Sequence, residues 1–302
     1  VGAGKPAKPP ATIGDLKPRT VDIRPDQKVD ASAARAMDNY RRYLEQKDAD
    51  PELRAEALRR LGDLNLEVGE GERIDKEVNA IDVAGAEAIE LYSSLLKAYP
   101  DYPRNDQVLY QLARAYETTG QPEKALAALD QVVERYPELV QLDEVDFRRG
   151  EILFSNKRYA EAEKAYKRAL DQGPGGSFHS QSLYKHGWSL FKQGQNEESL
   201  PSFAGVLDRN LTDPRDGNDL RAIDEMSRPD RELVEDTLRV MSITFSYLDG
   251  AASLDQFVAK RGEPPYSYLL YSRLGDLYVE KQRFQDGADA YRAFVARDPV
   301  DE

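Results

Sequence analysis

Residues 112–137, LARAYETTGQPEKALAALDQVVERYP, and residues 149–174, RGEILFSNKRYAEAEKAYKRALDQGP, repeat one pattern 37 residues apart. A small residue lies midway along the first apolar segment of three successive units, at Ala113, Gly150 and Gly187. Another small residue follows each of these after 12 positions, at Ala125, Ala162 and Ser199. A period of this length is typical of helical hairpins stacked into an array. The sequence therefore predicts an all-α fold, a right-handed superhelical solenoid of antiparallel helical hairpins.

The spacing of apolar residues and the turn residues between the apolar segments predict where each hairpin lies. Apolar residues recur three and four positions apart, and short turns at Gly120 and Gly194 make the two helices of a unit antiparallel neighbours. The expected helix pairs are 52–68 with 84–99, 105–119 with 122–136, 143–155 with 159–172, 179–193 with 196–207, 231–247 with 251–260, and 266–281 with 284–297. This gives about five to six repeats, with a degenerate unit at 231–260.

Four segments are expected along the chain. Residues 1–30 are rich in proline, which blocks helix interiors, and are predicted to form a disordered tail. Residues 31–207 hold repeats preceded by an extra helix, and residues 208–230 form an acidic insertion loop. Residues 231–302 hold further repeats. The array could be cut from a longer protein, because solenoids usually end in a polar capping helix and few residues follow Pro299.

Composition narrows the classes of function. The 302 residues carry a net charge of -13, which disfavours nucleic acid and anionic membrane surfaces as partners. No run of 18 apolar residues is present, so no direct membrane span is expected. The chain has no cysteine, which fits an oxidising compartment such as the periplasm and is equally compatible with the cytoplasm.

Catalytic, cofactor and metal motifs are not found. The two histidines, His179 and His186, are seven positions apart on one expected helix, too far apart to ligate a single ion. The sequence predicts a partly buried histidine at His186 instead. The segment VGAGKPAKPP lacks the strand and helix that a phosphate-binding loop needs. Carboxylates alternate with basic residues, as on a solvated helix face. We therefore expect no enzyme activity, no cofactor and no metal.

The recurring residues resemble the tetratricopeptide repeat (TPR). In the unit at 105–137, Leu112, Ala113 and Tyr116 are followed by Ala125 and a closing Pro137. The last unit shows the same order, with Leu274, Gly275, Tyr278, Gly287, Tyr291 and Pro299. Segments such as FRRGEILFSNKRYAEAEKAYKRAL are similar to TPR proteins of bacterial envelopes, including outer-membrane-assembly and Tol-Pal-associated proteins. The resemblance implies a scaffold that binds protein or peptide segments, here in a bacterial envelope complex and in the periplasm.

The same resemblance implies a binding site. In this family the first helices of successive hairpins line the concave face, so the matched positions predict an aromatic row flanked by charges. The expected site residues are Tyr110, Arg114, Phe147, Glu151, Phe154, Tyr184, Trp188, Phe191 and Lys192. Rigid aromatics with basic residues at their edge suit an extended peptide or an inserted helix. Packing between helices is the alternative role for the phenylalanines and, less so, for Trp188 and Tyr184.

Two other functions fit the same repeats. The chain could be a structural spacer or a self-associating module that forms a homo-oligomer, with an empty groove. It could also be the docking region of a longer enzyme. The preferred interpretation is a non-catalytic scaffold whose partner is a protein or peptide.

Overall fold

A computed structural model describes residues 32–46, 48–75, 78–212 and 223–297. Within these ranges it describes the side chains of all residues except 70–82. These residues form thirteen α-helices and one short 3-10 helix, Ile223–Glu225. The α-helices are α1 Ala33–Leu44, α2 Pro51–Asp75, α3 Val78–Ala98, α4 Asn105–Thr118, α5 Pro122–Arg135, α6 Leu142–Ser155, α7 Tyr159–Asp171, α8 His179–Lys192, α9 Asn196–Leu211, α10 Arg228–Tyr247, α11 Ala251–Lys260, α12 Ser267–Glu280 and α13 Phe284–Arg297.

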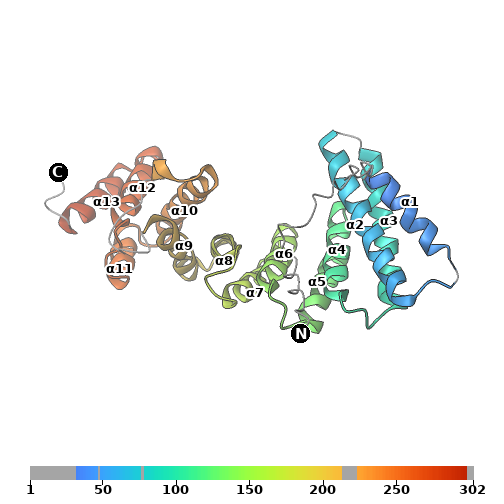
Figure 1. The fold of residues 1–302 in the computed structure, drawn as a ribbon. Helices are drawn as coiled ribbons and strands as arrows, with labels where there is room; N and C mark the ends of the chain where they lie inside the picture. The colour runs from blue at the N-terminus through green and yellow to red at the C-terminus, as the bar shows by residue number, and fades with distance from the viewer. Residues whose placement is uncertain (1–31, 47, 76–77, 213–222, 298–302) are drawn as a thin grey trace, which may run out of the picture.

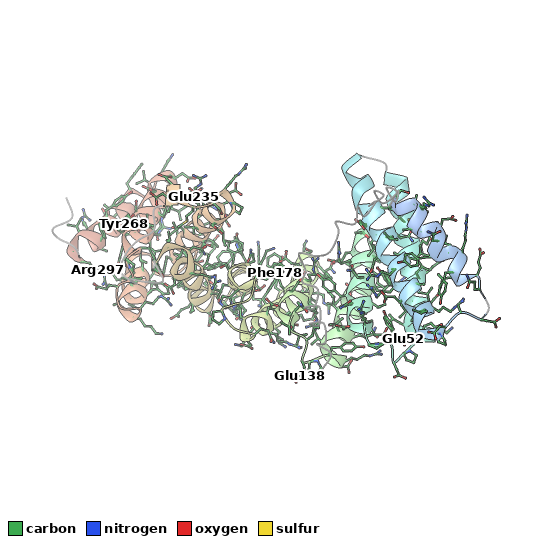
Figure 2. All side chains as sticks on the ribbon, viewed as in Figure 1. Glu52, Glu138, Phe178, Glu235, Tyr268 and Arg297 are labelled. Atoms are coloured by element: carbon green, nitrogen blue, oxygen red, sulfur yellow. The ribbon has the colours of Figure 1, made fainter. Side chains whose placement is uncertain are left out.

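The helices form an elongated, curved array in which each helix packs on its neighbours along the chain (Figure 1). Glu52 and Arg297 lie towards opposite ends, and Phe178 lies near the middle (Figure 2). The predicted all-α array of hairpins is confirmed, and the extra helix before the first hairpin is α1. The expected tail, residues 1–30, lies outside the described residues.

Two expected boundaries differ from the structure. Helix α2 continues to Asp75, and α3 begins at Val78, where the sequence suggested a polar stretch between shorter helices. The part of that stretch within α2 holds Glu70, Glu72 and Arg73, which favour a helix in spite of Gly69 and Gly71. In the expected 208–230 loop, α9 runs on to the buried Leu211, and α10 begins at Arg228 behind the N-cap Ser227. Residues 213–222 lie outside the described part.

A glycine on the first helix of a hairpin faces an aromatic ring of the second. A Cβ on Gly150 would lie 2.6 Å from Cδ1 of Tyr166, and one on Gly187 would lie 2.8 Å from Cε1 of Phe203. Gly62 with Tyr92 and Gly275 with Tyr291 repeat this contact. In these four hairpins the glycine makes room for a ring, and the ring packs the two helices of the hairpin together.

The tyrosines of these pairs also bond to the residue after the glycine. Tyr92 donates to Asp63 at 2.8 Å, Tyr166 to Glu151 at 2.5 Å, and Tyr291 to Asp276 at 2.8 Å. The hairpin of α8 and α9 lacks both the tyrosine hydroxyl and the carboxylate, because its ring is Phe203 and the residue after Gly187 is Trp188. Trp188 therefore occupies a position that holds a carboxylate in the other three hairpins that carry this glycine.

Among the described helices, none combines the length and the apolar character that crossing a membrane needs.

Candidate functional site

The first helices of the hairpins, α2, α4, α6, α8, α10 and α12, form one surface, here called the first-helix face. Two cavities of this face are lined mainly by these helices. One, of about 320 Å³, lies among α2, α4 and α6 and includes Tyr110. The other, of about 640 Å³, lies between α10 and α12. Contacts arrange the nine predicted site residues along this face in three groups.

The first group is on α4. Tyr110 donates a hydrogen bond to Glu144 of α6, and the Arg148 guanidinium lies 5.4 Å from its ring centroid. Burial, and then the bond to Glu144, raise the pKa of Tyr110 above its usual value, so the hydroxyl stays a donor. Arg114 donates to Gln111 at 3.1 Å. The polar tip of Tyr110 therefore joins two repeats.

The second group is on α6. Phe147 stacks on Phe178 with ring centroids 4.9 Å apart, and Phe154 meets Tyr159 edge-on at 5.2 Å. Glu151 accepts from Tyr166 and pairs with Lys185 of α8 at 3.0 Å. Lys185 also lies 5.1 Å from the centroid of Phe154. These contacts tie α6 to α7 and α8, as in the alternative role that the sequence left open for the phenylalanines.

The third group is on α8 and extends to α10. Trp188 meets Phe191 edge-on at 5.4 Å, and the Lys192 ammonium lies 5.4 Å from the Trp188 ring centroid. Phe191 stacks on Tyr247 with centroids 5.9 Å apart and planes 14° apart. Tyr247 is 66% exposed, and Lys192 is exposed too. We call Trp188, Phe191, Lys192 and Tyr247 the aromatic cluster.

Tyr184 packs against the aromatic cluster and bonds to α10. Its ring meets Trp188 at 6.3 Å, and its hydroxyl donates to Asp236 of α10. Burial and this bond raise the pKa of Tyr184 above its usual value. Asp236 also pairs with Arg239, so its charge is balanced. Tyr184 thereby fixes α8 against α10 and holds the aromatic cluster in place.

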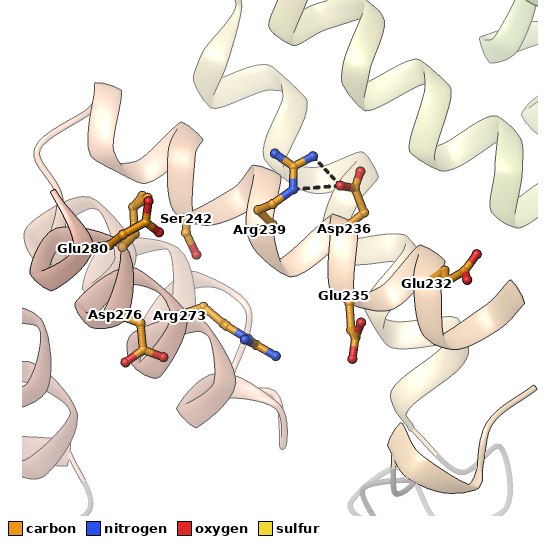
Figure 3. A pocket seen from close by; sticks show the side chains of 9 residues that line it. Glu232, Glu235, Asp236, Arg239, Ser242, Arg273, Asp276 and Glu280 are labelled. Atoms are coloured by element: carbon orange, nitrogen blue, oxygen red, sulfur yellow. Dashed lines mark hydrogen bonds and ion pairs between the residues drawn. The ribbon is translucent and has the colours of Figure 1, made fainter. Parts of the chain in front are cut away.

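The 640 Å³ cavity lies next to Tyr184, because Asp236, which accepts the Tyr184 hydroxyl, also lines the cavity. Figure 3 shows carboxylates of α10 and α12 around this cavity, with Arg239 and Arg273 among them. The carboxylates are Glu232, Glu235, Asp236, Asp276 and Glu280. Acidic side chains outnumber basic ones here, so this end of the first-helix face carries negative charge.

Sequence reasoning missed Tyr247, Lys185 and Asp236. Tyr247 and Asp236 are on α10, whose degenerate unit lacks a clear repeat register, so no spacing argument could place them beside α8. Lys185 could have been found, since it precedes Gly187 by two positions on a helix already assigned to the face.

Neither histidine is placed to bind a metal. His186 is partly buried, as predicted, with Nδ1 2.8 Å from Oγ of Ser202 and Nε2 3.8 Å from Glu163. Burial lowers the pKa of His186 and of His179, which favours neutral rings. Within the described residues, no group of three or more His, Cys, Asp or Glu side chains is arranged to hold an ion.

Models of the tetratricopeptide repeat match residues 85–140, 110–177 and 246–302, and a second such model matches residues 181–210. Together the matches cover more than half of the chain. The chain belongs to the tetratricopeptide repeat family. The matches include α4 to α7 and most of α8 and α9, so the TPR units carry all three groups of predicted site residues.

Several solved structures are similar in fold. MamA AMB-1 in a P212121 crystal is 23% identical, with a TM-score of 0.42 over 59% of this chain and 90% of that one. YrrB, described as a TPR protein with an unusual peptide-binding site, is 16% identical, with a TM-score of 0.40 over 70% and 95%. A TPR protein from Parabacteroides merdae is 17% identical, with a TM-score of 0.42 over 78% and 79%. No curated protein matches the chain. The family assignment therefore rests on the repeat models.

Proposed function

We propose that this TPR protein is a non-catalytic scaffold that binds a peptide segment of another protein on its first-helix face. The aromatic cluster on α8 and α10 is the centre of the site. The observation that carries the proposal is the exposed pair of Tyr247 and Lys192 beside the half-buried rings of Trp188 and Phe191. Rings held in fixed positions offer large contact area at a low entropy cost.

The internal contacts separate binding residues from supporting ones. Tyr184, Tyr110 and Glu151 each bond to a polar side chain of the next repeat. We therefore assign these three residues a structural role, which is to hold neighbouring first helices together. Trp188 and Phe191 touch other rings and stay partly exposed, so we assign them the contact with an apolar side chain of the ligand. Lys192 adds a cation at the same edge, which suits a carboxylate on the ligand.

Trp188 is the single tryptophan of the chain, so its fluorescence reports directly on the site. Peptides would be selected from a random display library on the immobilised protein and then titrated into it in solution. We expect binding to shift the Trp188 emission. Phe191→Ala and Tyr247→Ala should each weaken binding at least about tenfold, as central aromatic contacts do.

The matched control is Val140→Ala, which removes a side chain that is 90% exposed between α5 and α6. It should leave both the affinity and the emission change as they are. Selected peptides that bind the same to Phe191→Ala and Tyr247→Ala, and leave the emission of Trp188 unchanged, would reject this site.

We extend the proposal to an assembly in a bacterial envelope, with the protein in the periplasm. The chain has no cysteine, as suits an oxidising compartment, and its repeats are similar to those of envelope TPR proteins. Fractionation of the native cells, followed by an immunoblot, tests this. Recovery with the cytoplasmic marker would exclude it.

A further inference from the structure

Residues 5–19 are a cationic segment in a chain with an excess of acidic residues. The segment, KPAKPPATIGDLKPR, holds four basic residues against one acidic residue, whereas the whole chain carries a net charge of -13. It also holds four prolines. Proline restricts the backbone before any contact forms, so such a segment loses little entropy when it binds in an extended conformation. The two other longer segments outside the described residues, 213–222 and 298–302, carry more acidic than basic residues.

The 320 Å³ cavity among α2, α4 and α6 offers the opposite charge. Its carboxylates are on Asp63, Asp106 and Glu144. Two of them are already paired, Asp63 with Arg59 at 2.7 Å and Glu144 with Arg148 at 3.2 Å. Asp106 is partly exposed and, among the described residues, has no hydrogen bond or ion pair. The cavity therefore favours a cationic ligand, and Asp106 is the carboxylate left to pair with it.

The other side chains of this cavity suit a segment rich in proline. Tyr110, Leu139 and Val145 give it an apolar wall, and the ring of Tyr110 is partly exposed. Grooves lined by aromatic rings are a common binding site for proline-rich segments. Gln107 and Gln141 are exposed and, within the described part of the chain, their side chains form no hydrogen bond. Their amides can therefore bond to the backbone of an extended segment.

The position of α1 brings residues 5–19 within reach of this cavity. Helices α1 and α2 pack side by side and are joined by residues 45–50, so they are antiparallel neighbours (Figure 1). The 12 residues of α1 extend about 18 Å, which brings Ser32 level with about Asp63 on α2. Packed helix axes are about 8–10 Å apart, so α4 lies roughly 20 Å from α1. Residues 20–31 can span about 40 Å, which exceeds this distance.

We propose that residues 5–19 bind across the 320 Å³ cavity of their own chain. The lysines of the segment lie beside Asp106, and its prolines pack against Tyr110. The chain then carries a ligand for α2, α4 and α6 within its own sequence. This half of the first-helix face is closed to other proteins, while the aromatic cluster on α8 and α10 stays open to a partner. The proposal therefore does not depend on peptide binding at the aromatic cluster.

Disulfide cross-linking in the full chain tests the proposal. The chain has no cysteine, so each introduced pair is unambiguous. Ala11→Cys marks the segment, and Gln141→Cys marks the exposed edge of the cavity. Ala127→Cys, at an exposed position of the second helix α5, is the control. At about 1 micromolar protein, we expect Ala11→Cys to form an intrachain disulfide with Gln141→Cys at least about tenfold faster than with Ala127→Cys, because binding raises the effective concentration at the cavity.

Charge changes test whether this contact forms the cross-link. Lys5→Glu with Lys8→Glu should slow the disulfide to Gln141→Cys at least about fivefold, and Asp106→Lys alone should do the same. All three changes together should recover part of the rate, because opposite charges meet again. Lys164→Glu, at an exposed position of α7, should leave the rate unchanged. Circular dichroism checks that each variant stays helical.

Three results would overturn the proposal. The first is an equal rate for the pair at the cavity and the pair on α5, since the segment then has no preferred position. The second is a rate at the cavity that the charge changes in the segment and at Asp106 leave unaltered. The third is a disulfide that joins two chains, because the segment of a second copy then occupies the cavity.

Discussion

Gly150→Ala tests the glycine–ring packing that is found in four of the hairpins. In a helix interior, alanine is favoured over glycine by about 1 kcal/mol, so local propensity alone predicts a more stable protein. The added Cβ would lie 2.6 Å from Cδ1 and 2.7 Å from Cζ of Tyr166. That ring is fully buried and its hydroxyl bonds to Glu151, so it has little freedom to move away.

Overpacking of this kind costs about 1–3 kcal/mol, and the fixed ring favours the upper end. Set against the gain in propensity, the expected net loss in free energy of unfolding is about 2 kcal/mol. Urea denaturation followed by circular dichroism measures it. Gly175→Ala is the control, because nothing lies within 4 Å of its Cβ position; its effect should stay within about 0.5 kcal/mol.

The chain itself suggests a rescue. The hairpin of Ala113 has Leu129 where the hairpins of Gly150, Gly187 and Gly275 have a ring, at the same spacing of 16 positions. Gly150→Ala with Tyr166→Leu copies that pair, so the two losses should not add, with a coupling energy of at least about 1 kcal/mol. An unchanged or higher stability of Gly150→Ala alone, or strictly additive losses in the double variant, would refute the reasoning.

Three further outcomes are expected from urea denaturation. Burial lowers the pKa of His186 in the folded state, so its stabilising contribution is present above the ordinary pKa of 6.5 and is lost as the pH falls; His186→Leu should flatten this loss between neutral and acidic pH. Tyr184→Phe removes the donor to Asp236 and should cost about 1–2 kcal/mol. Gly250→Ala should cost about 2 kcal/mol, because φ is +58° and the Cβ would lie 2.6 Å from Oη of Tyr278; a neutral result would contradict this.

The repeat register made most of the fold predictable. Gly150 and Gly187 are 37 residues apart, and each has an aromatic 16 positions later, so the period reports a glycine–ring contact that recurs in successive hairpins. The ends of α2 and α9 could not be found in this way. The residues that extend those two helices lie beyond the spacing that repeats within the chain. Their helical state depends on local propensity and on burial of side chains such as Leu211.

The residues of the proposed site were predictable only in part. The first helices of the hairpins could be assigned, and with them Trp188, Phe191 and Lys192. The partners on α10 could not, because the connection from α9 is irregular and its length gives no register for Tyr247 or Asp236. Cross-repeat bonds of tyrosine hydroxyls also depend on the orientation of neighbouring hairpins, which no sequence spacing defines.

The glycine–ring contact within four of the hairpins has a consequence for how the molecule unfolds. Gly62, Gly150, Gly187 and Gly275 each contact a ring of their own hairpin, so unfolding of a hairpin at one end need not unfold the other hairpins. Heating or proteolysis should then release the array piece by piece, leaving a shorter yet ordered remainder that still holds Trp188 against Phe203.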